Sequence, residues 1–294
     1  MMTTPHASGR LYIVATPIGC LEDITLRALR TLEEVDLVLA EDTRRAAVLF
    51  QHHGVTTPRR SYHAHSTDNQ TSQVVERLLS GRTIALISDA GTPLISDPGH
   101  PLVMAAIAHG ITVESIPGPS AVVTALTVAG IAISGFSFHG FLPRSGRRRQ
   151  DALHRIAQSY CASVLYESPR RTAQTLQDIA TLTGDERPAA LCRELTKMHE
   201  EVVRGTLATL QEYCSKGVRG EVCLVIAPLP EAKAEDRTVP ASVLDLITEL
   251  VHRGMSRRDA AAKLTEHTDL SKKQAYQVVL DLPSTPTTDD PEPS

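Results

Sequence analysis

Short apolar runs alternate with amphipathic segments over the first 117 residues, and this alternation constrains the fold more than any other feature. Strands are predicted over residues 11–15, 37–40, 83–87 and 112–116, and helices over residues 25–34, 70–80, 100–109 and 121–129. Runs of four or five consecutive apolar residues indicate strands that are buried on both faces. The sequence therefore predicts an α/β fold with a mostly parallel N-terminal sheet and helices on both of its faces.

The apolar run at 83–87 ends in ISDAGTPLISDPG (87–99), a segment that holds glycine, proline and aspartate twice each. Such a cluster ends a strand, and ligands of parallel α/β sheets bind at the carboxyl ends of the strands. Gly91 would let a ligand approach the main chain closely, and Pro93 and Pro98 would stiffen the loop. The segment is therefore either a preformed binding loop or an ordinary strand-to-helix connection.

Polar residues also gather where other predicted strands end. Glu41, Asp42 and Arg44 follow the strand at 37–40, and Asp42 is suited to cap a helix that begins there. Ser120, in PGPSA (117–121), is suited to cap the next helix, whose first amides would favour a carboxylate or a phosphate. These strand ends are either binding positions or ordinary helix starts.

The second half of the chain contains two further patterns. Strands are predicted over 136–141, 163–166, 189–193, 200–204 and 221–227, and helices over 150–158, 172–181 and 207–216. Three short helices follow within 241–282, with capping-box patterns at Ser256 and Ser271, and form either a helix-turn-helix or a plain helical cap. The predicted organisation is a flexible N-terminus (1–10), an N-terminal α/β domain (11–117), a second α/β domain (118–228), a linker (229–240), a helical C-terminal segment (241–283) and a disordered tail (284–294).

Charge and composition limit the contacts that the protein can make with nucleic acid. The formal net charge of −4 gives no overall attraction to nucleic acid, so any such contact must be local. The segment RSGRRR (144–149) is rich in arginine, and it either binds phosphate groups or is merely solvated. Aromatic residues make up 3% of the chain, which argues against a base-stacking surface rich in aromatic rings.

Other residue types bear on metals and on the compartment. The five cysteines form no CxxC motif, which indicates a reducing compartment and argues against a cysteine-based zinc site. His63 and His65 lack the further ligands of a metal site, so we expect no metal. Without a signal-like apolar core or a run of about 18 apolar residues, the protein is expected to be cytoplasmic, with no membrane contact.

Eight motifs in order resemble the tetrapyrrole methylase superfamily, and in particular its branch that methylates ribosomal RNA. They are LYIVATPIG (11–19), LAEDTRR (39–45), ISDAGTPLISDPG (87–99), PGPSA (117–121), GFLPR (140–144), YESPRR (166–171), CRELTK (192–197) and RGEVCLVI (219–226). The loop ISDAGTP differs from the GDPxxxG of the tetrapyrrole-modifying branch, and no GxGxxG motif of a Rossmann methyltransferase opens the chain. The resemblance therefore favours RNA over a tetrapyrrole as the substrate.

This resemblance implies two α/β domains with S-adenosylmethionine bound in the cleft between them, mostly by backbone groups, and a homodimer without metal. It implies methylation of the 2′-hydroxyl of a cytidine in the decoding region of 16S rRNA, either free or in the assembled small ribosomal subunit. By motif, the cofactor would be held by Pro17, Ser88, Asp89, Ala90, Gly91, Thr92, Pro93, Ser120, Ala121, Tyr166, Glu167, Leu195, Gly220 and Glu221.

Methyl transfer to a ribose hydroxyl requires the oxygen to lie in line with the methyl group, and a nearby base or cation assists loss of its proton. The catalytic candidates are Glu167, Arg193, Glu194 and Lys197, of which Lys197 would stabilise the developing alkoxide and Glu194 would orient it. Each of them is alternatively a structural ion pair.

The candidate RNA-binding residues are Arg44, Arg144, Arg147, Arg148 and Arg149.

Two other functions compete with rRNA methylation. One is methylation of a small tetrapyrrole, which would need neither RSGRRR nor the C-terminal helices. The other is a non-catalytic regulator that binds nucleic acid through those helices, which leaves the motifs of the cleft unexplained.

Overall fold

The structure is a computed structural model that describes residues 9–63, 66–229, 241–268, 270 and 272–282. Residues 1–229 form one compact unit and residues 230–294 a second. Most of the predicted flexible N-terminus, the linker and the tail lie outside the described residues, as do His65 and Ser271.

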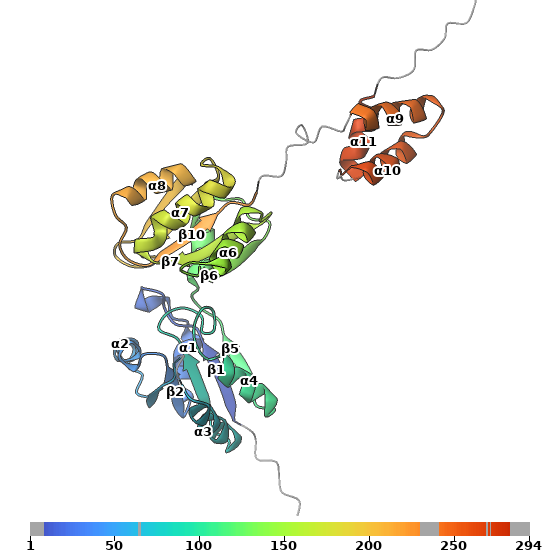
Figure 1. Ribbon diagram of the computed structural model, residues 1–294. Helices are drawn as coiled ribbons and strands as arrows, with labels where there is room; N and C mark the ends of the chain where they lie inside the picture. The colour runs from blue at the N-terminus through green and yellow to red at the C-terminus, as the bar shows by residue number, and fades with distance from the viewer. Residues whose placement is uncertain (1–8, 64–65, 230–240, 269, 271, 283–294) are drawn as a thin grey trace, which may run out of the picture. The chain divides into compact units, whose positions relative to one another are not determined.

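The first sheet of the larger unit is fully parallel, as the sequence predicts (Figure 1). Its strands lie in the order β3-β2-β4-β1-β5. They are β1 (Arg10–Val14), β2 (Leu37–Ala40), β3 (Arg59–Ser61), β4 (Ile84–Ile87) and β5 (Thr112–Ile116). The edge strand β3 has the exposed sequence RRS, so no apolar run marks it, and the sequence analysis missed it.

Two pairs of helices cover the two faces of this sheet, because side chains alternate along each strand. From β1, Leu11 and Ile13 pack under α3 (Asp68–Leu79) and α4 (His100–Ala108). Val14 packs on the opposite face, under α1 (Leu26–Glu34) and α2 (Thr43–His53). Both faces are thus filled, and the carboxyl ends of the strands are left to the loops. At one of these ends, Asp42 caps α2 as predicted, accepting a hydrogen bond from the Arg44 amide at 2.8 Å.

The second sheet is mixed, with the strand order β6-β7-β10-β8-β9. Its strands are β6 (Phe136–Phe141), β7 (Ala162–Glu167), β8 (Pro188–Arg193), β9 (Glu201–Thr206) and β10 (Val222–Ile226). Only β6 and β7 pair in parallel, and the other neighbours are antiparallel.

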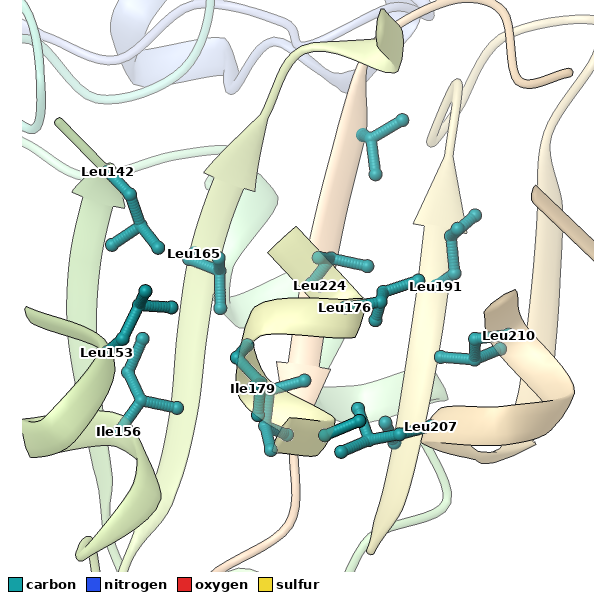
Figure 2. Close-up of a cluster of buried hydrophobic side chains, with 14 of the residues drawn as sticks. Leu142, Leu153, Ile156, Leu165, Leu176, Ile179, Leu191, Leu207, Leu210 and Leu224 are labelled. Carbon is teal, nitrogen blue, oxygen red and sulfur yellow. The ribbon is translucent and has the colours of Figure 1, made fainter. Parts of the chain in front are cut away.

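One face of this sheet is covered by α6 (Arg147–Ala157), α7 (Pro169–Thr183) and α8 (Leu207–Ser215). Figure 2 shows leucines of the strands, among them Leu165, Leu191 and Leu224, together with side chains of these helices in one cluster. The other face packs against α5 (Ala121–Val128) and against Ile18 and Leu195 from two loops. Loops of the first sheet therefore reach this second face.

Several helix starts differ from the prediction; α7, for example, begins at Pro169 rather than at residue 172. The hydroxyl of Ser120 makes no capping hydrogen bond to α5, although the residue occupies the N-cap position. Helix α6 begins at Arg147 rather than at residue 150, so part of RSGRRR is helical. Cations are unfavourable at a helix N-terminus, so a start at Arg147 could not be predicted from the local charge pattern.

The smaller unit contains α9 (Ala241–His252), α10 (Arg257–His267) and α11 (Lys272–Leu280). These helices share a core that includes Ile247, Leu264 and Val279. The predicted cap of α10 is confirmed, since the Ser256 hydroxyl accepts a hydrogen bond from the Asp259 amide at 3.1 Å. Among all described residues, no helix is long and apolar enough to cross a membrane.

Candidate functional site

A cavity of about 370 Å³ lies where the loops of the first sheet meet the second sheet. Its walls include most of the residues proposed to hold the cofactor: Ala90, Gly91, Thr92, Ser120, Ala121, Tyr166, Glu167, Leu195, Gly220 and Glu221. We refer to it as the first cavity. Its size falls within the range of small-molecule sites, about 300–1,000 Å³.

Three loops of the first sheet form one wall and are tied together by hydrogen bonds. Thr16 and Gly91 exchange two backbone hydrogen bonds, of 2.9 and 3.0 Å. The Thr92 hydroxyl donates to the carbonyl of Pro119 at 3.2 Å. Gly91 has a φ of +76°, a conformation that favours glycine. The loop is therefore held in a fixed shape around the cavity.

Backbone strain is concentrated in two loops that border this cavity. Among the described residues other than glycine, those with positive φ are Leu94, Ser96, Glu194 and Thr196. Each such residue costs on the order of 1–3 kcal/mol, and strain of this kind clusters at functional sites. The amide of Cys20 donates to the Thr196 hydroxyl at 3.0 Å, which joins a loop of the first sheet to one of the second.

The floor of the cavity is a row of side chains across the second sheet. Tyr166, Cys223 and Cys192 are successive register partners on β7, β10 and β8, so they share one face. Burial raises the pKa of both thiols, that of Cys192 to about 11, so they remain neutral. Neither cysteine was predicted as a site residue, because their position depends on strand register.

The acidic residues Asp97, Glu167 and Glu221 are the charged side chains among the described residues of the first cavity. Glu167 is fully buried, accepts hydrogen bonds from the Thr175 hydroxyl and the Ser168 amide, both at 2.8 Å, and forms an ion pair with Arg171 at 3.3 Å. Burial raises the pKa of Asp97 to about 6, helped by the nearby carboxylates of Glu41 and Asp89. Glu167 and Glu221 have cationic partners, whereas Asp97 forms no ion pair with another described residue. Asp97 is therefore the carboxylate that suits this cavity to a cationic ligand with apolar parts.

A second cavity of about 330 Å³ adjoins the first and shares Ile18, Ala90 and Glu221 with it. It contains the other predicted cofactor residues Pro17, Ser88 and Asp89, together with Arg45 and Lys197. Pro93 lines neither cavity.

Arg45 was missed by the sequence analysis, which selected its neighbour Arg44. Arg45 forms an ion pair with Asp89 at 3.3 Å inside the second cavity. Arg44 is exposed and pairs with Asp42 at 2.7 Å. One step along a helix turns a side chain by about 100°, and that turn separates the two arginines.

Lys197 lines the second cavity, and one of its ion-pair partners lines both cavities. Its ammonium group is 3.0 Å from Glu194 and 3.1 Å from Glu221, which lines both cavities. Burial by itself would lower the pKa of Lys197, but the two carboxylates outweigh it and raise that pKa. Lys197 is therefore a cation at neutral pH. Glu194 also accepts the Glu221 amide at 2.9 Å, so it positions both Lys197 and the chain beside it.

Two predicted site residues have structural partners instead. Arg193 pairs with Glu201 at 2.7 Å and lines neither cavity, which favours the alternative of a structural ion pair. Arg149 is only 8% exposed and binds Asp178 at 2.6 Å, so its guanidinium cannot meet an RNA phosphate at the surface. We therefore omit Arg193 from the catalytic proposal and Arg149 from the RNA-binding proposal. Arg144, Arg147 and Arg148 remain exposed.

Comparison with solved structures places this arrangement in a known fold. The structure of a cobalt precorrin-4 methyltransferase aligns with a TM-score of 0.59 at 17% identity and covers 77% of this chain and 98% of that chain. A uroporphyrin-III C-methyl transferase from Thermus thermophilus, complexed with S-adenyl homocysteine, aligns with a TM-score of 0.55 at 21% identity, over 74% of this chain and 97% of that one. The fold is thus that of the tetrapyrrole methylases.

Sequence comparison identifies the family and a branch within it. The family model of Tetrapyrrole (Corrin/Porphyrin) Methylases matches residues 10–211. A Synechocystis protein is 45% identical over 277 residues, covering 93% of this chain and 98% of its own. A Haemophilus influenzae protein is 41% identical over 273 residues, covering 92% and 96%. Both are named ribosomal RNA small subunit methyltransferase I. The chain therefore belongs to the tetrapyrrole methylase family, in the branch that these relatives form.

The methyl donor of this family is S-adenosylmethionine, whose sulfonium carries a positive charge. The first cavity fits such a group, since its walls are largely apolar and its charged side chains are all acidic. The main chain of Ala90, Gly91 and Thr92 and the start of α5 would hold the donor, with Tyr166 and Leu195 packed against it.

Proposed function

We propose that the protein transfers a methyl group from S-adenosylmethionine to the ribose 2′-hydroxyl of a cytidine in the decoding region of small-subunit rRNA. The observation that carries the proposal is a pair of adjoining cavities, of which the second brings cations next to the first. The first cavity is largely apolar with acidic charged residues, and the second contains Arg45 and Lys197, which pair there with Asp89 and Glu221. The names of the relatives and the ISDAGTP loop support rRNA as the substrate.

In this proposal the donor occupies the first cavity and the target nucleotide enters the second. The donor supplies an electrophilic methyl group. Residues of the tied loops fix its orientation, and the acidic walls favour the charged sulfonium over the neutral thioether that remains after transfer. Loss of that attraction assists release of the spent donor.

Lys197 has a defined part in this scheme. Because its pKa is raised, it remains protonated and acts as a cation, not as the base that accepts the ribose proton. It would stabilise negative charge that develops on the ribose oxygen, while Glu194 and Glu221 hold it in place. Electrostatic stabilisation of this kind contributes about 10²–10³-fold to a rate.

The test uses the purified protein with donor labelled in its methyl group and two RNA substrates, free 16S rRNA and assembled small subunits. We expect label in RNA, released as 2′-O-methylcytidine on complete digestion with nuclease and phosphatase. Label in a base, or label only in uroporphyrinogen III offered in parallel, would contradict the proposal. The two RNA substrates also reveal whether assembly is required.

We further propose that the protein works in the cytoplasm, where ribosomal subunits are assembled, and as the homodimer that the resemblance implies. Among the described residues, no group of three His, Cys, Asp or Glu side chains is placed to hold a metal ion.

A further inference from the structure

An aromatic ring stands exposed at the rim of the first cavity. Phe141 is the last residue of β6, is 59% exposed and lines the cavity. Its ring centroid lies 5.6 Å from that of Tyr166, which in turn packs against Phe138 at 4.9 Å. Single exposed apolar side chains are ordinary on a protein surface, but this ring forms part of a cavity wall, where a bound ligand can cover it.

A β-bulge directs this ring toward the cavity. On a regular strand, Phe141 would share the face of Ser137 and His139, opposite to Phe138. Phe138 pairs with Val164 and Phe141 with Tyr166, so three steps along β6 match two along β7. The extra residue turns Phe141 onto the face of Phe138 and Tyr166. Bulges that re-aim a side chain are frequent beside active sites.

Gly140 makes this bulge possible. Its φ is +60°, and a Cβ added at this position would lie 2.9 Å from the Ser96 hydroxyl oxygen, in the strained loop of the first sheet. The bulge is therefore built into the sequence, and it sets Phe141 next to the strained loop that borders the cavity.

The chain after Phe141 is held by two arginines. Arg171 donates to the Leu142 carbonyl at 2.8 Å, and the buried Arg149 donates to that of Pro143 at 3.2 Å. Leu142 is itself buried in the core shown in Figure 2. Phe141 thus projects from a fixed support, although it is exposed.

Three exposed arginines come directly after this held segment in the sequence. Arg144, Arg147 and Arg148 are exposed, and no hydrogen bond or ion pair links their side chains to another described residue. A rigid aromatic ring beside exposed arginines is the combination that single-stranded RNA requires, with bases on the ring and phosphates on the guanidinium groups.

We infer that Phe141 stacks against a base that flanks the methylated cytidine, where the substrate RNA crosses the rim of the first cavity, with Arg144, Arg147 and Arg148 on the adjoining phosphates. This inference rests on the proposed function and specifies how RNA reaches the donor. Few aromatic residues are available, since the chain has 4 Phe, 6 Tyr and no Trp. The proposed contact therefore uses a single ring, which agrees with a composition that argues against a surface rich in aromatic rings.

The test compares Phe141→Leu with Phe136→Leu. Phe136 is a matched control, because it is 49% exposed at the other end of the same strand and lines neither cavity. We expect Phe141→Leu to weaken binding of a small-subunit rRNA fragment about tenfold, the scale of losing one base stacked on an aromatic ring. Phe141→Tyr, which keeps a ring, should bind RNA normally. Donor affinity, measured calorimetrically without RNA, should change little in all variants.

Three results would overturn the inference. One is equal RNA affinity in Phe141→Leu and Phe136→Leu. Another is a loss of donor affinity in Phe141→Leu without any further loss of RNA affinity, which would show that the ring covers the donor. The third is a defect in Phe141→Tyr as large as that of the Leu variant, at unchanged thermal stability. Failure of the proposed function is distinguishable, because wild type and Phe136→Leu would then also leave rRNA unmethylated.

Discussion

Asp97 provides a quantitative test of the acidic cavity. Because burial raises its pKa from 3.8 to about 6, the folded protein binds the proton more tightly than the unfolded chain does. The resulting stabilisation is fully present below pH 3.8 and is lost as the pH rises through about 6. This difference in the pKa of Asp97 corresponds to about 3 kcal/mol of folding stability, which we discount to about 1–2 kcal/mol because Asp97 is only half-buried.

At neutral pH the folded protein bears the cost of keeping the Asp97 carboxylate ionised in a partly buried place. Asp97→Asn removes this cost, so the variant without ligand should be more stable than wild type at neutral pH. About half of the difference develops between pH 5 and pH 8, so the advantage of the variant should grow by about 0.5–1 kcal/mol over that range. Urea unfolding at the two pH values measures it. Asp151→Asn is the control, since Asp151 is exposed on α6 without a hydrogen bond or ion pair to another described residue. Identical pH dependence in both variants would refute the reasoning.

The same substitution should weaken donor binding. One of the cavity's carboxylates is lost, and a partly screened charge pair several ångströms apart contributes about 1–2 kcal/mol. We therefore expect about tenfold weaker binding of S-adenosylmethionine at pH 8, with a smaller effect on S-adenosylhomocysteine, which lacks the positive charge. Equal losses for the two ligands would indicate a steric or packing effect and would remove Asp97 from the electrostatic account.

Two further predictions concern the cations of the site. Lys197→Ala should lower the single-turnover methylation rate about 10²-fold with little change in donor or RNA affinity; a normal rate with lower thermal stability would make Lys197 a structural residue. Replacing Arg147 and Arg148 by Ala should weaken RNA binding and flatten its salt dependence. Arg149→Ala should instead cost about 3–5 kcal/mol of folding stability, because it leaves Asp178 unpaired in a partly buried setting. A normal salt slope in the double variant would contradict RNA binding by Arg147 and Arg148. Normal stability in Arg149→Ala would contradict a structural role for Arg149.

Most of the first sheet could be predicted from the sequence, because its central strands are short apolar runs that end at turn residues. β2 and β5 have the predicted bounds, and β1 and β4 differ by one residue at their ends. β3 could not be predicted, since its residues are exposed and polar. Backbone pairing with β2 alone makes it a strand, and that pairing is a long-range contact.

The candidate site shows the same division between local and long-range signals. Loops such as 88–92 could be predicted because a glycine- and proline-rich segment follows a buried strand, although the predicted Pro93 lines neither cavity. Asp97 and the cysteines of the floor were missed because their environment is created by the second sheet. The position of Phe141 depends on a bulge against β7, and Arg149 was misassigned because Asp178, its partner, lies far along the chain. Charge patterns show where arginines occur, but they do not show which are buried.

The central claim, ribose methylation of small-subunit rRNA, is tested most directly by mapping 2′-O-methyl groups along that rRNA in a strain that lacks this protein. Ribose methylation protects the adjacent phosphodiester from alkaline cleavage, so each modified nucleotide appears as a gap in the cleavage ladder. We predict that one cytidine in the decoding region loses its protection and regains it when the wild-type chain is supplied. The Lys197→Ala chain should restore it slowly or not at all. An unchanged ladder in the deletion strain would contradict the account.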